Sequence, residues 1–415
     1  MSKLKTIGVI TLLILAWTVF VVMGFIKGYL LRSISSDDSP EAFIEAVKAY
    51  PEKEFVGSQA IVLIEDGKVA AKDFYSLDEV VDSQTVFPVA SISKWVTAWG
   101  VMKLVQDGKL ELDAAVDQYL NKWHLPKSNY ENNKVTIRRL LSHSSGIICD
   151  IETDQFNPQA KEVQQITDLL TRYKGDDFIY FEPGSQYAYS NIGYAILQLV
   201  IEEVSQQSFA DYMEQTVFEP LQMTHSTFSI DDRSDLKLAQ LYDENHQLTK
   251  PHRDVPLAAG GLFTSVEDLS TFIQAHLETN PVLSQETLDL MLAPQTYIHN
   301  IAVYGLGPDF YSQSDKASKI IGHDGVGGIA ALNTAARIDM KSHDGIILIR
   351  MGSFYTASEL ADEWMFWKAG ITDRVVMERN MPFLAILLGV GYLIIGISFF
   401  LIKKNTNKRK QSSQG

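Results

Sequence analysis

The stretch Val86-Phe87-Pro88-Val89-Ala90-Ser91-Ile92-Ser93-Lys94 joins an extended apolar run to a helical pattern that continues to Val105. Apolar residues recur on successive turns from Trp95 onwards, which is typical of a buried helix. We therefore expect Ser91 to lie in the first turn of a helix. Free backbone N–H groups at that position favour developing negative charge.

Lys94 follows Ser91 by three residues, so its side chain can reach the serine hydroxyl from one helical turn away. A serine hydroxyl is a poor nucleophile until a neighbouring base takes its proton, and a lysine with a depressed pKa can do this. Tyr189, in Tyr189-Ser190-Asn191, is the other candidate base. We expect cationic Lys94 and His323 to lower the pKa of Tyr189.

Three motifs occur in the order Ser91-Ile92-Ser93-Lys94, Tyr189-Ser190-Asn191 and His323-Asp324-Gly325. Each motif is weak alone, because a Ser-x-x-Lys tetrad arises by chance in many chains of this length. Their order and their surroundings add the specificity. Together they supply the parts of an acylating active site and indicate a serine hydrolase.

With these motifs the chain resembles the serine beta-lactamase and DD-peptidase family, in particular its class C branch with related esterases and D-amino-acid peptidases. The resemblance covers roughly residues 55–370. It implies that Ser91 is the nucleophile of an acyl-enzyme and that Lys94 and Tyr189 share proton transfer. It also implies that Asn191 hydrogen-bonds the substrate amide and helps to fix Lys94.

The third motif of that family is usually Lys-Thr-Gly or His-x-Gly, on an edge strand beside the serine. The resemblance implies an oxyanion hole made by the backbone N–H groups of Ser91 and Val326, and a strand where Gly325 admits the substrate backbone. His323 replaces a lysine that commonly helps to recognise the beta-lactam carboxylate, and histidine is only partly charged at neutral pH. We therefore expect peptidase, esterase or amidase action rather than efficient beta-lactamase action.

Each site residue also has a simpler interpretation. Ser91 alone would be a helix N-cap, Tyr189 a packed aromatic residue and His323 an ordinary loop histidine. We expect His143 to be structural, with its ring hydrogen-bonded to a turn.

Cys149 is the single cysteine, so we expect no internal disulfide and a buried rather than a reactive thiol.

The composition argues against several other classes of protein. The nine histidines are scattered and no His-Glu-x-x-His or paired Cys-x-x-Cys motif is present, so we expect no metal site. No glycine-rich phosphate loop precedes a helix, and we expect no cofactor. Removing the seven basic residues of the two tails leaves a formal charge of −22 on residues 7–402, which disfavours nucleic acid as a partner.

Residues 7–26 and 381–402 contain no charged residue and are long enough to cross a bilayer as helices. By the positive-inside rule, the flanking basic residues place both termini in the cytoplasm and the intervening chain outside the cell membrane. The alternative for the first segment is a cleaved signal peptide. The flanking basic residues are Lys3, Lys5, Lys403, Lys404, Lys408, Arg409 and Lys410.

Strand patterns near both ends of the chain, with a long helical middle, predict an α+β fold. We expect an antiparallel sheet flanked by helices with an inserted helical domain, and two transmembrane helices in addition. The expected divisions are an N-terminal transmembrane helix at 1–30, a linker with a short helix at 31–54, the hydrolase domain at 55–370, a linker at 371–380, a second transmembrane helix at 381–402 and a basic cytoplasmic tail at 403–415.

The leading hypothesis is a membrane-anchored, extracytoplasmic serine hydrolase that cleaves D-alanyl-type amide or ester bonds of the cell wall through a Ser91 acyl-enzyme. One alternative is a beta-lactamase, which needs fast deacylation. Another is a penicillin-binding sensor or scaffold without turnover, which would need a protein partner in the membrane because the cytoplasmic tail is short. The sequence identifies no protein partner.

Overall fold

The computed structural model describes residues 3–50, 57–77, 79–148, 165–173, 178–243, 245–250, 256–312, 318–327 and 330–412. The chain divides into two compact units. One comprises residues 39–361 and contains all the candidate site residues. The other comprises residues 1–38 together with 362–415.

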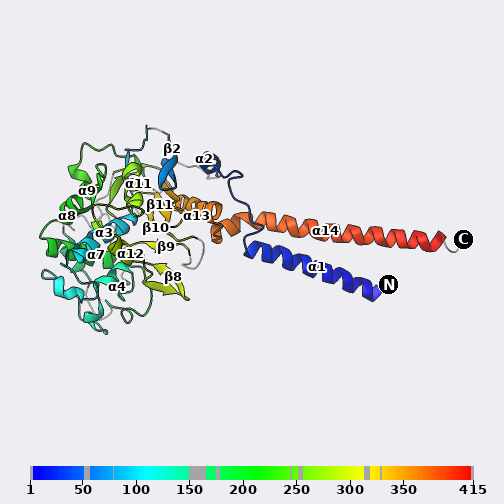
Figure 1. Cartoon of the computed structure of the whole chain (residues 1–415), viewed down its shortest axis with the longest axis horizontal. Coiled ribbons are helices and arrows are strands. Elements are labelled where there is room, and N and C mark those ends of the chain that lie inside the picture. The colour runs from blue at the N-terminus through cyan, green and yellow to red at the C-terminus, as the bar shows by residue number, and fades with distance from the viewer. Residues whose placement is uncertain are drawn as a thin grey trace. The chain divides into compact units, whose positions relative to one another are not determined.

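An antiparallel sheet of eight strands forms the framework of unit 39–361, in the order β2-β1-β12-β11-β10-β9-β8-β7 (Figure 1). The two ends of the unit therefore meet at β1 and β12. The strands are β1 Ser58–Glu65, β2 Lys68–Ser76, β7 Thr296–Ile298, β8 Ile301–Tyr304, β9 Asp309–Phe310, β10 Ile320–Val326, β11 Leu332–Asp339 and β12 Gly345–Met351.

The first two strands form a hairpin around a two-residue turn, Asp66-Gly67, where both residues have positive φ, 49° and 74°. Such a turn matches the twist of the flanking strands, and glycine adopts its second position without a steric penalty. Strand β1 is buried along most of its length, and β12 pairs with its other edge, with Val62 opposite Ile347.

Most of the helices and the short strands lie in the sequence between β2 and β7, whereas α2 precedes β1 and α13 follows β12. The helices are α2 Pro40–Lys48, α3 Ile92–Gln106, α4 Ile137–Leu141, α6 Ile166–Leu170, α7 Asn191–Ser205, α8 Phe209–Met213, α9 Glu219–Leu221, α10 Leu257–Gly260, α11 Val266–Gln274, α12 Gln285–Met291 and α13 Thr356–Ala369. Two small antiparallel sheets pair β3 Val86–Pro88 with β6 Phe263–Ser265, and β4 Leu241–Tyr242 with β5 Leu248–Thr249.

Helix α3 lies in the core, with twelve of its fifteen residues buried. A helix that is apolar around its whole circumference needs neighbours on every side. Trp99 packs on Phe272 of α11 and donates its indole N–H to Nε2 of His276 at 3.1 Å. Tyr212 of α8 donates to the carbonyl oxygen of Gly100 at 2.9 Å. These contacts fix the helix that carries Ser91 and Lys94.

The second unit contains α1 Lys3–Ile26 and α14 Arg374–Ser412, which lie side by side (Figure 1). Both helices include segments long and apolar enough to cross a membrane, Lys5–Ile26 and Arg374–Lys404. The Trp17 indole N–H donates to the carbonyl oxygen of Leu387 at 3.2 Å. A Cβ at Gly391 would lie 1.9 Å from that indole nitrogen, so the contact needs a glycine there.

The sequence prediction of a linker at 371–380 is partly wrong, since α14 already begins at Arg374. The Asp373 carboxylate accepts from the Val376 backbone N–H at 3.0 Å, which caps the helix, and Arg374 forms an i,i+4 ion pair with Glu378. These local contacts start the helix before its apolar segment. The sequence analysis located this helix by its run of apolar residues, and such a run marks only the apolar part of a helix and not its polar first turns.

The α+β class, the antiparallel sheet and the helical insertion are confirmed. Strands β7, β8 and β9 were not predicted, because each has two to four residues and gives no clear alternation. They place β10 inside the sheet rather than at an edge. Since β9 pairs only with Ile321 and Gly322 of β10, the part of β10 after Gly322 still has one side free of strand pairing.

The burial of α3 generates a stability prediction. Trp99→Ala should lower the free energy of unfolding by about 3–5 kcal/mol, because it leaves a cavity and an unpaired His276 nitrogen. Tyr297→Ala, at a half-exposed residue of β7, is the matched control and should change little. Chemical denaturation of the detergent-solubilised chain, followed by circular dichroism, measures both. Equal effects of the two substitutions would contradict this account of the core.

Candidate active site

Ser91 lies at the junction between β3 and α3, directly after a strained residue. Ala90 has a positive φ of 45°, which costs a residue with a side chain roughly 1 kcal/mol or more. Two contacts hold this turn: the Val89 N–H donates to the Leu262 carbonyl oxygen at 3.1 Å, and the Thr334 hydroxyl donates to the Val89 carbonyl oxygen at 3.0 Å. The turn thus ties the serine to the sheet.

The Ser91 side chain is directed at Lys94 rather than at its own helix. Lys94 Nζ donates to Ser91 Oγ at 3.1 Å, and Ser91 makes no side-chain capping bond although it occupies the N-cap position. Its backbone is already helical, with φ −66° and ψ −9°, whereas a capping serine normally has an extended backbone. The geometry therefore disfavours a mere helix cap.

Lys94 has no exposed surface, although it carries an ionisable group. Its Nζ donates to the carbonyl oxygen of Ala259 at 2.6 Å in addition to Ser91, and it lies 4.8 Å from the ring centre of Tyr189 and 5.7 Å from that of Tyr194. Aromatic faces and a carbonyl oxygen compensate for lost hydration. These contacts hold the nitrogen next to the serine hydroxyl.

Tyr189 precedes α7 and is positioned through its neighbour, Ser190. The Ser190 hydroxyl caps the helix by accepting from the Gly193 N–H at 3.0 Å, and the Ser190 backbone N–H donates to Nδ1 of His143 at 3.0 Å. The buried ring of His143 also lies 4.3 Å from that of Tyr189, centre to centre. His143 therefore holds the Tyr189 segment, in keeping with a structural role.

The expectation that Lys94 and His323 lower the pKa of Tyr189 is wrong in direction. Burial raises the pKa of Tyr189 well above its usual value near 10, and a hydrogen bond with Ser91 opposes this only in part. One reason is that His323 supplies no positive charge at neutral pH. Although 37% of Tyr189 is exposed, its raised pKa keeps the side chain a neutral phenol.

His323 in β10 is 2% exposed, and burial together with nearby Lys94 lowers its pKa to about 4. Its Nδ1 lies 2.6 Å from the carbonyl oxygen of Asp324 and its Nε2 3.1 Å from the Tyr304 hydroxyl. His323 therefore offers almost no exposed surface for the predicted direct contact with a substrate. His323 instead packs behind Tyr189, with ring centres 6.3 Å apart.

Asp324, the middle residue of the third motif, pairs with a buried arginine. Arg337 of β11 donates to Asp324 Oδ2 at 2.9 Å and lies over the ring of Tyr311, whose hydroxyl donates to Asp324 Oδ1 at 3.0 Å. The positive charge of Arg337 is therefore already balanced within the sheet.

Gly325 lies against the serine turn. A Cβ at this position would lie 2.4 Å from Thr334 Oγ1, 2.4 Å from the Val89 carbonyl oxygen and 3.1 Å from the Ser91 nitrogen. Only a residue without a side chain allows β10 to approach so closely. The predicted glycine thus places the strand beside the backbone N–H of Ser91.

The direction of the Val326 N–H follows from the strand register. The Gly327 N–H donates to the Leu332 carbonyl oxygen, and Val326 is opposite Asn333. In an antiparallel ladder hydrogen-bonded and non-hydrogen-bonded pairs alternate, so the Val326 N–H points away from β11. It faces the side of β10 that β9 leaves open, as an oxyanion donor requires, and half of Val326 is exposed.

The expected free amides in the first turn of α3 are largely occupied. The N–H groups of Ile92, Ser93 and Lys94 donate to the carbonyl oxygens of residues 89, 90 and 91. The tight turn at Ala90 brings these carbonyls within reach. Stabilisation of negative charge therefore depends on the Ser91 N–H itself and not on the helix terminus as a whole.

Asn191 is the first residue of α7, and its side chain makes no hydrogen bond to any of the residues that the structure describes. Its role towards the substrate amide stays a prediction.

Sequence reasoning missed the Ala259 carbonyl oxygen that binds Lys94, because a backbone atom has no signature in the sequence. It also missed Asp309, whose carboxylate lies 3.9 Å from His323 Nε2. Cys149 lies outside the described residues.

No group of three or more potential metal ligands occurs within the described parts of the chain. The arrangement contains a serine hydroxyl in contact with a buried lysine, a tyrosine next to both, and two backbone N–H groups from different segments. Such an arrangement can form and stabilise a tetrahedral acyl intermediate.

Comparison with known proteins agrees with this chemistry. The model of the family described as Beta-lactamase matches residues 43–349. Protein flp of Staphylococcus aureus (strain MW2) is 28% identical over 255 residues, which cover 58% of this chain and 50% of that protein. Penicillin-binding protein 4* of Bacillus subtilis (strain 168) is 32% identical over 145 residues, 35% of this chain and 31% of that protein.

Among solved structures, the octameric penicillin-binding protein homologue from Pyrococcus abyssi has a TM-score of 0.70 and 25% identity, over 83% of this chain and 79% of that one. The chain belongs to the beta-lactamase family. It has the beta-lactamase fold. The chain spans about half the length of the flp protein that it matches.

The close approach of β10 predicts the effect of a single methyl group. Gly325→Ala should slow acylation of Ser91 about a hundredfold, because the strand and the serine turn must separate by roughly 1 Å. Gly260→Ala is the control, since nothing lies within 4 Å of a Cβ there. Stopped-flow acylation with a chromogenic ester measures both. A Gly325→Ala enzyme that acylates at the wild-type rate would show that this contact is unimportant.

Buried histidines predict how stability depends on pH. Burial lowers the pKa values of His276 and His323 to about 4, below the ordinary 6.5. Between these values the unfolded chain binds protons that the folded chain does not, so the free energy of unfolding falls as the pH drops from about 6.5 to 4. Each histidine contributes a slope of up to about 1.4 kcal/mol per pH unit.

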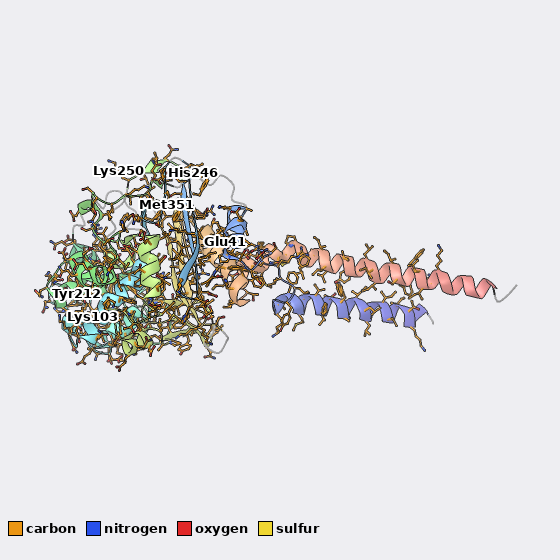
Figure 2. The ribbon with its side chains drawn as sticks, turned by 45° about the horizontal axis from the view of Figure 1, so that its top comes forward. Glu41, Lys103, Tyr212, His246, Lys250 and Met351 are labelled. Atoms are coloured by element: carbon orange, nitrogen blue, oxygen red, sulfur yellow. The ribbon has the colours of Figure 1, made fainter. Side chains whose placement is uncertain are left out.

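Denaturation at several pH values tests this with His276→Asn, which should reduce the slope by one proton. His246→Asn, at an exposed residue (Figure 2), is the control. The readout is the slope and not the absolute stability. An unchanged slope in His276→Asn would refute the assignment.

Proposed function

We propose that this protein is a membrane-anchored, extracytoplasmic serine hydrolase that acts on D-alanyl-type amide or ester bonds through an acyl-enzyme on Ser91. The observation that carries the proposal is the contact between Ser91 Oγ and the buried Nζ of Lys94 at 3.1 Å, with Tyr189 beside them. Burying a lysine side chain is costly, and a serine that only capped a helix would not require one beside it.

In the acylation step, Ser91 Oγ attacks the carbonyl carbon while its proton passes to the pair formed by Lys94 and Tyr189. In the reactive form of the enzyme Lys94 has lost its proton, and its amine accepts the proton of Ser91 and still donates to the Ala259 carbonyl oxygen, which keeps it in place. Tyr189, a neutral phenol with a hydrogen bond to Ser91, relays a proton to the leaving group. Water then hydrolyses the acyl-enzyme by the reverse path.

The oxyanion that forms in both steps is bound by the backbone N–H groups of Ser91 and Val326. The Gly325 contact supports this, since it brings the strand next to the Ser91 nitrogen. Fixed backbone dipoles need little reorganisation when charge develops, and they contribute a large part of the rate. Asn191 completes the site by binding the substrate amide.

The substrate class rests on the family resemblance and on two relatives that are named for penicillin binding. The location rests on two helices that are long and apolar enough to span a membrane, α1 and α14, together with the basic residues in their outer ends. The positive-inside rule then places unit 39–361 outside the cytoplasm, where cell-wall peptides and esters occur.

Labelling of intact cells with a membrane-impermeant, serine-directed fluorescent probe tests nucleophile and location together. The wild type should be labelled, and D-alanyl esters or peptides should compete. Ser91→Ala should abolish labelling, and Lys94→Ala should slow it roughly 10²–10⁴-fold, the usual share of proton transfer. Ser185→Ala, at an exposed serine, should behave as the wild type.

Two outcomes would contradict separate parts of the proposal. Undiminished labelling of Ser91→Ala would refute the nucleophile. Labelling that appears only after cell lysis, yet still depends on Ser91, would refute the extracytoplasmic location alone.

A further inference from the structure

Asp309, at the start of β9, has no part in the proposed reaction although it lies at the site. It is opposite Gly322 and Tyr304 in the sheet, and its Oδ2 lies 3.9 Å from Nε2 of His323. Its side chain keeps 28% of its surface exposed. Asp309 is thus close to His323 and partly exposed.

The neutral ring of His323 cannot donate a hydrogen bond to Asp309. A carbonyl oxygen only accepts, so the contact between His323 Nδ1 and the Asp324 carbonyl assigns the ring proton to Nδ1. The lone pair is then on Nε2, where it accepts from the Tyr304 hydroxyl. Asp309 therefore faces a lone pair and not an N–H group.

The neighbouring cations are engaged elsewhere. Arg337 pairs with Asp324, and Lys94 donates to Ser91 and Ala259. Burial and the Asp324 charge raise the pKa of Asp309 to about 8, while Arg337 and Lys94 oppose the rise only in part. The titratable or charged groups that face Asp309 are His323, Asp324, Arg337, Lys94, Tyr187, Tyr189, Tyr194, Tyr304 and Tyr311.

We propose that ionised Asp309 sets the charge selectivity of this active site: it disfavours acyl substrates that carry a carboxylate close to the scissile bond and favours those with a neutral or cationic group there. The proposal rests on the proposed function, because it assumes that substrates are acylated at Ser91. Where Asp309 is ionised, it narrows the substrate class to esters or amides without such a carboxylate.

The electrostatic reach of Asp309 supports this selectivity. The charge of Asp309 raises the pKa of Tyr189, and the charge of Lys94 lowers the pKa of Asp309. A charged group on a substrate bound next to Tyr189 and Lys94 therefore also interacts with Asp309. Neutral His323 provides no compensating positive charge. Asp309 is anionic above pH 8 and a neutral carboxyl below it, so discrimination against a carboxylate increases as the pH rises.

A matched pair of substrates isolates the effect. The thioglycolate ester of N-acetyl-D-alanine carries a carboxylate next to the scissile bond, and the corresponding thioglycolamide carries none. The kcat/KM ratio of amide to carboxylate substrate should rise about tenfold from pH 6.5 to pH 9, the size expected for one charge pair across a partly solvated site. Both substrates need the same ionisation of Lys94 and Tyr189, so those effects cancel in the ratio.

Asp309→Asn should make this ratio independent of pH and lower it by about tenfold at pH 9. Asp231→Asn, at an exposed carboxylate of the helical turn Ile230–Asp232, should leave it as in the wild type. An Asp309→Asn enzyme with the wild-type ratio at both pH values would overturn the proposal.

The wild-type enzyme provides a second test that needs no variant. A ratio that stays constant between pH 6.5 and pH 9 would overturn the proposal even if Asp309→Asn failed to fold. Failure of the proposed function is recognised separately, because turnover of the neutral thioglycolamide would then persist in Ser91→Ala.

Discussion

The contact between Lys94 and Ser91 is the interaction on which the rest of this site depends. Removing a lysine side chain from water is costly, and Lys94 has no exposed surface at all. The Ala259 carbonyl oxygen and the rings of Tyr189 and Tyr194 replace its hydration. The carbonyl belongs to α10 and the two tyrosines lie at the start of α7, so these segments must meet around α3 before the site can exist.

The sheet makes that meeting possible. Strands from the two ends of unit 39–361 pair at β1 and β12, and β10 then lies against the turn before α3 through Gly325. The strained Ala90 is held there by Leu262 and Thr334. The fold therefore supplies the energy that keeps Ser91 next to an unfavourable turn, and it brings β10 close to the Ser91 backbone nitrogen.

The electrostatic character of the site was harder to predict than its residues. The motifs indicate a partly charged His323 and a tyrosine of lowered pKa, whereas burial makes both neutral. A motif carries no information about desolvation, which depends on what packs around it. Asp309 was not predicted to belong to the site for a similar reason. It lies in a strand of only two residues, and it comes close to His323 only when the sheet has formed.

The sequence by itself determined the fold class and the spacing of Ser91 and Lys94. It also determined the two apolar segments at the chain ends, because helical and strand periodicity and the i,i+3 relation are local properties. Tertiary structure decided that the Ser91 hydroxyl contacts Lys94 instead of capping the helix, and that His323 lies buried behind Tyr189. It also decided where each charge is balanced. The physical reason is that solvation and electrostatic pairing depend on neighbours that are distant in sequence, and only folding brings these together.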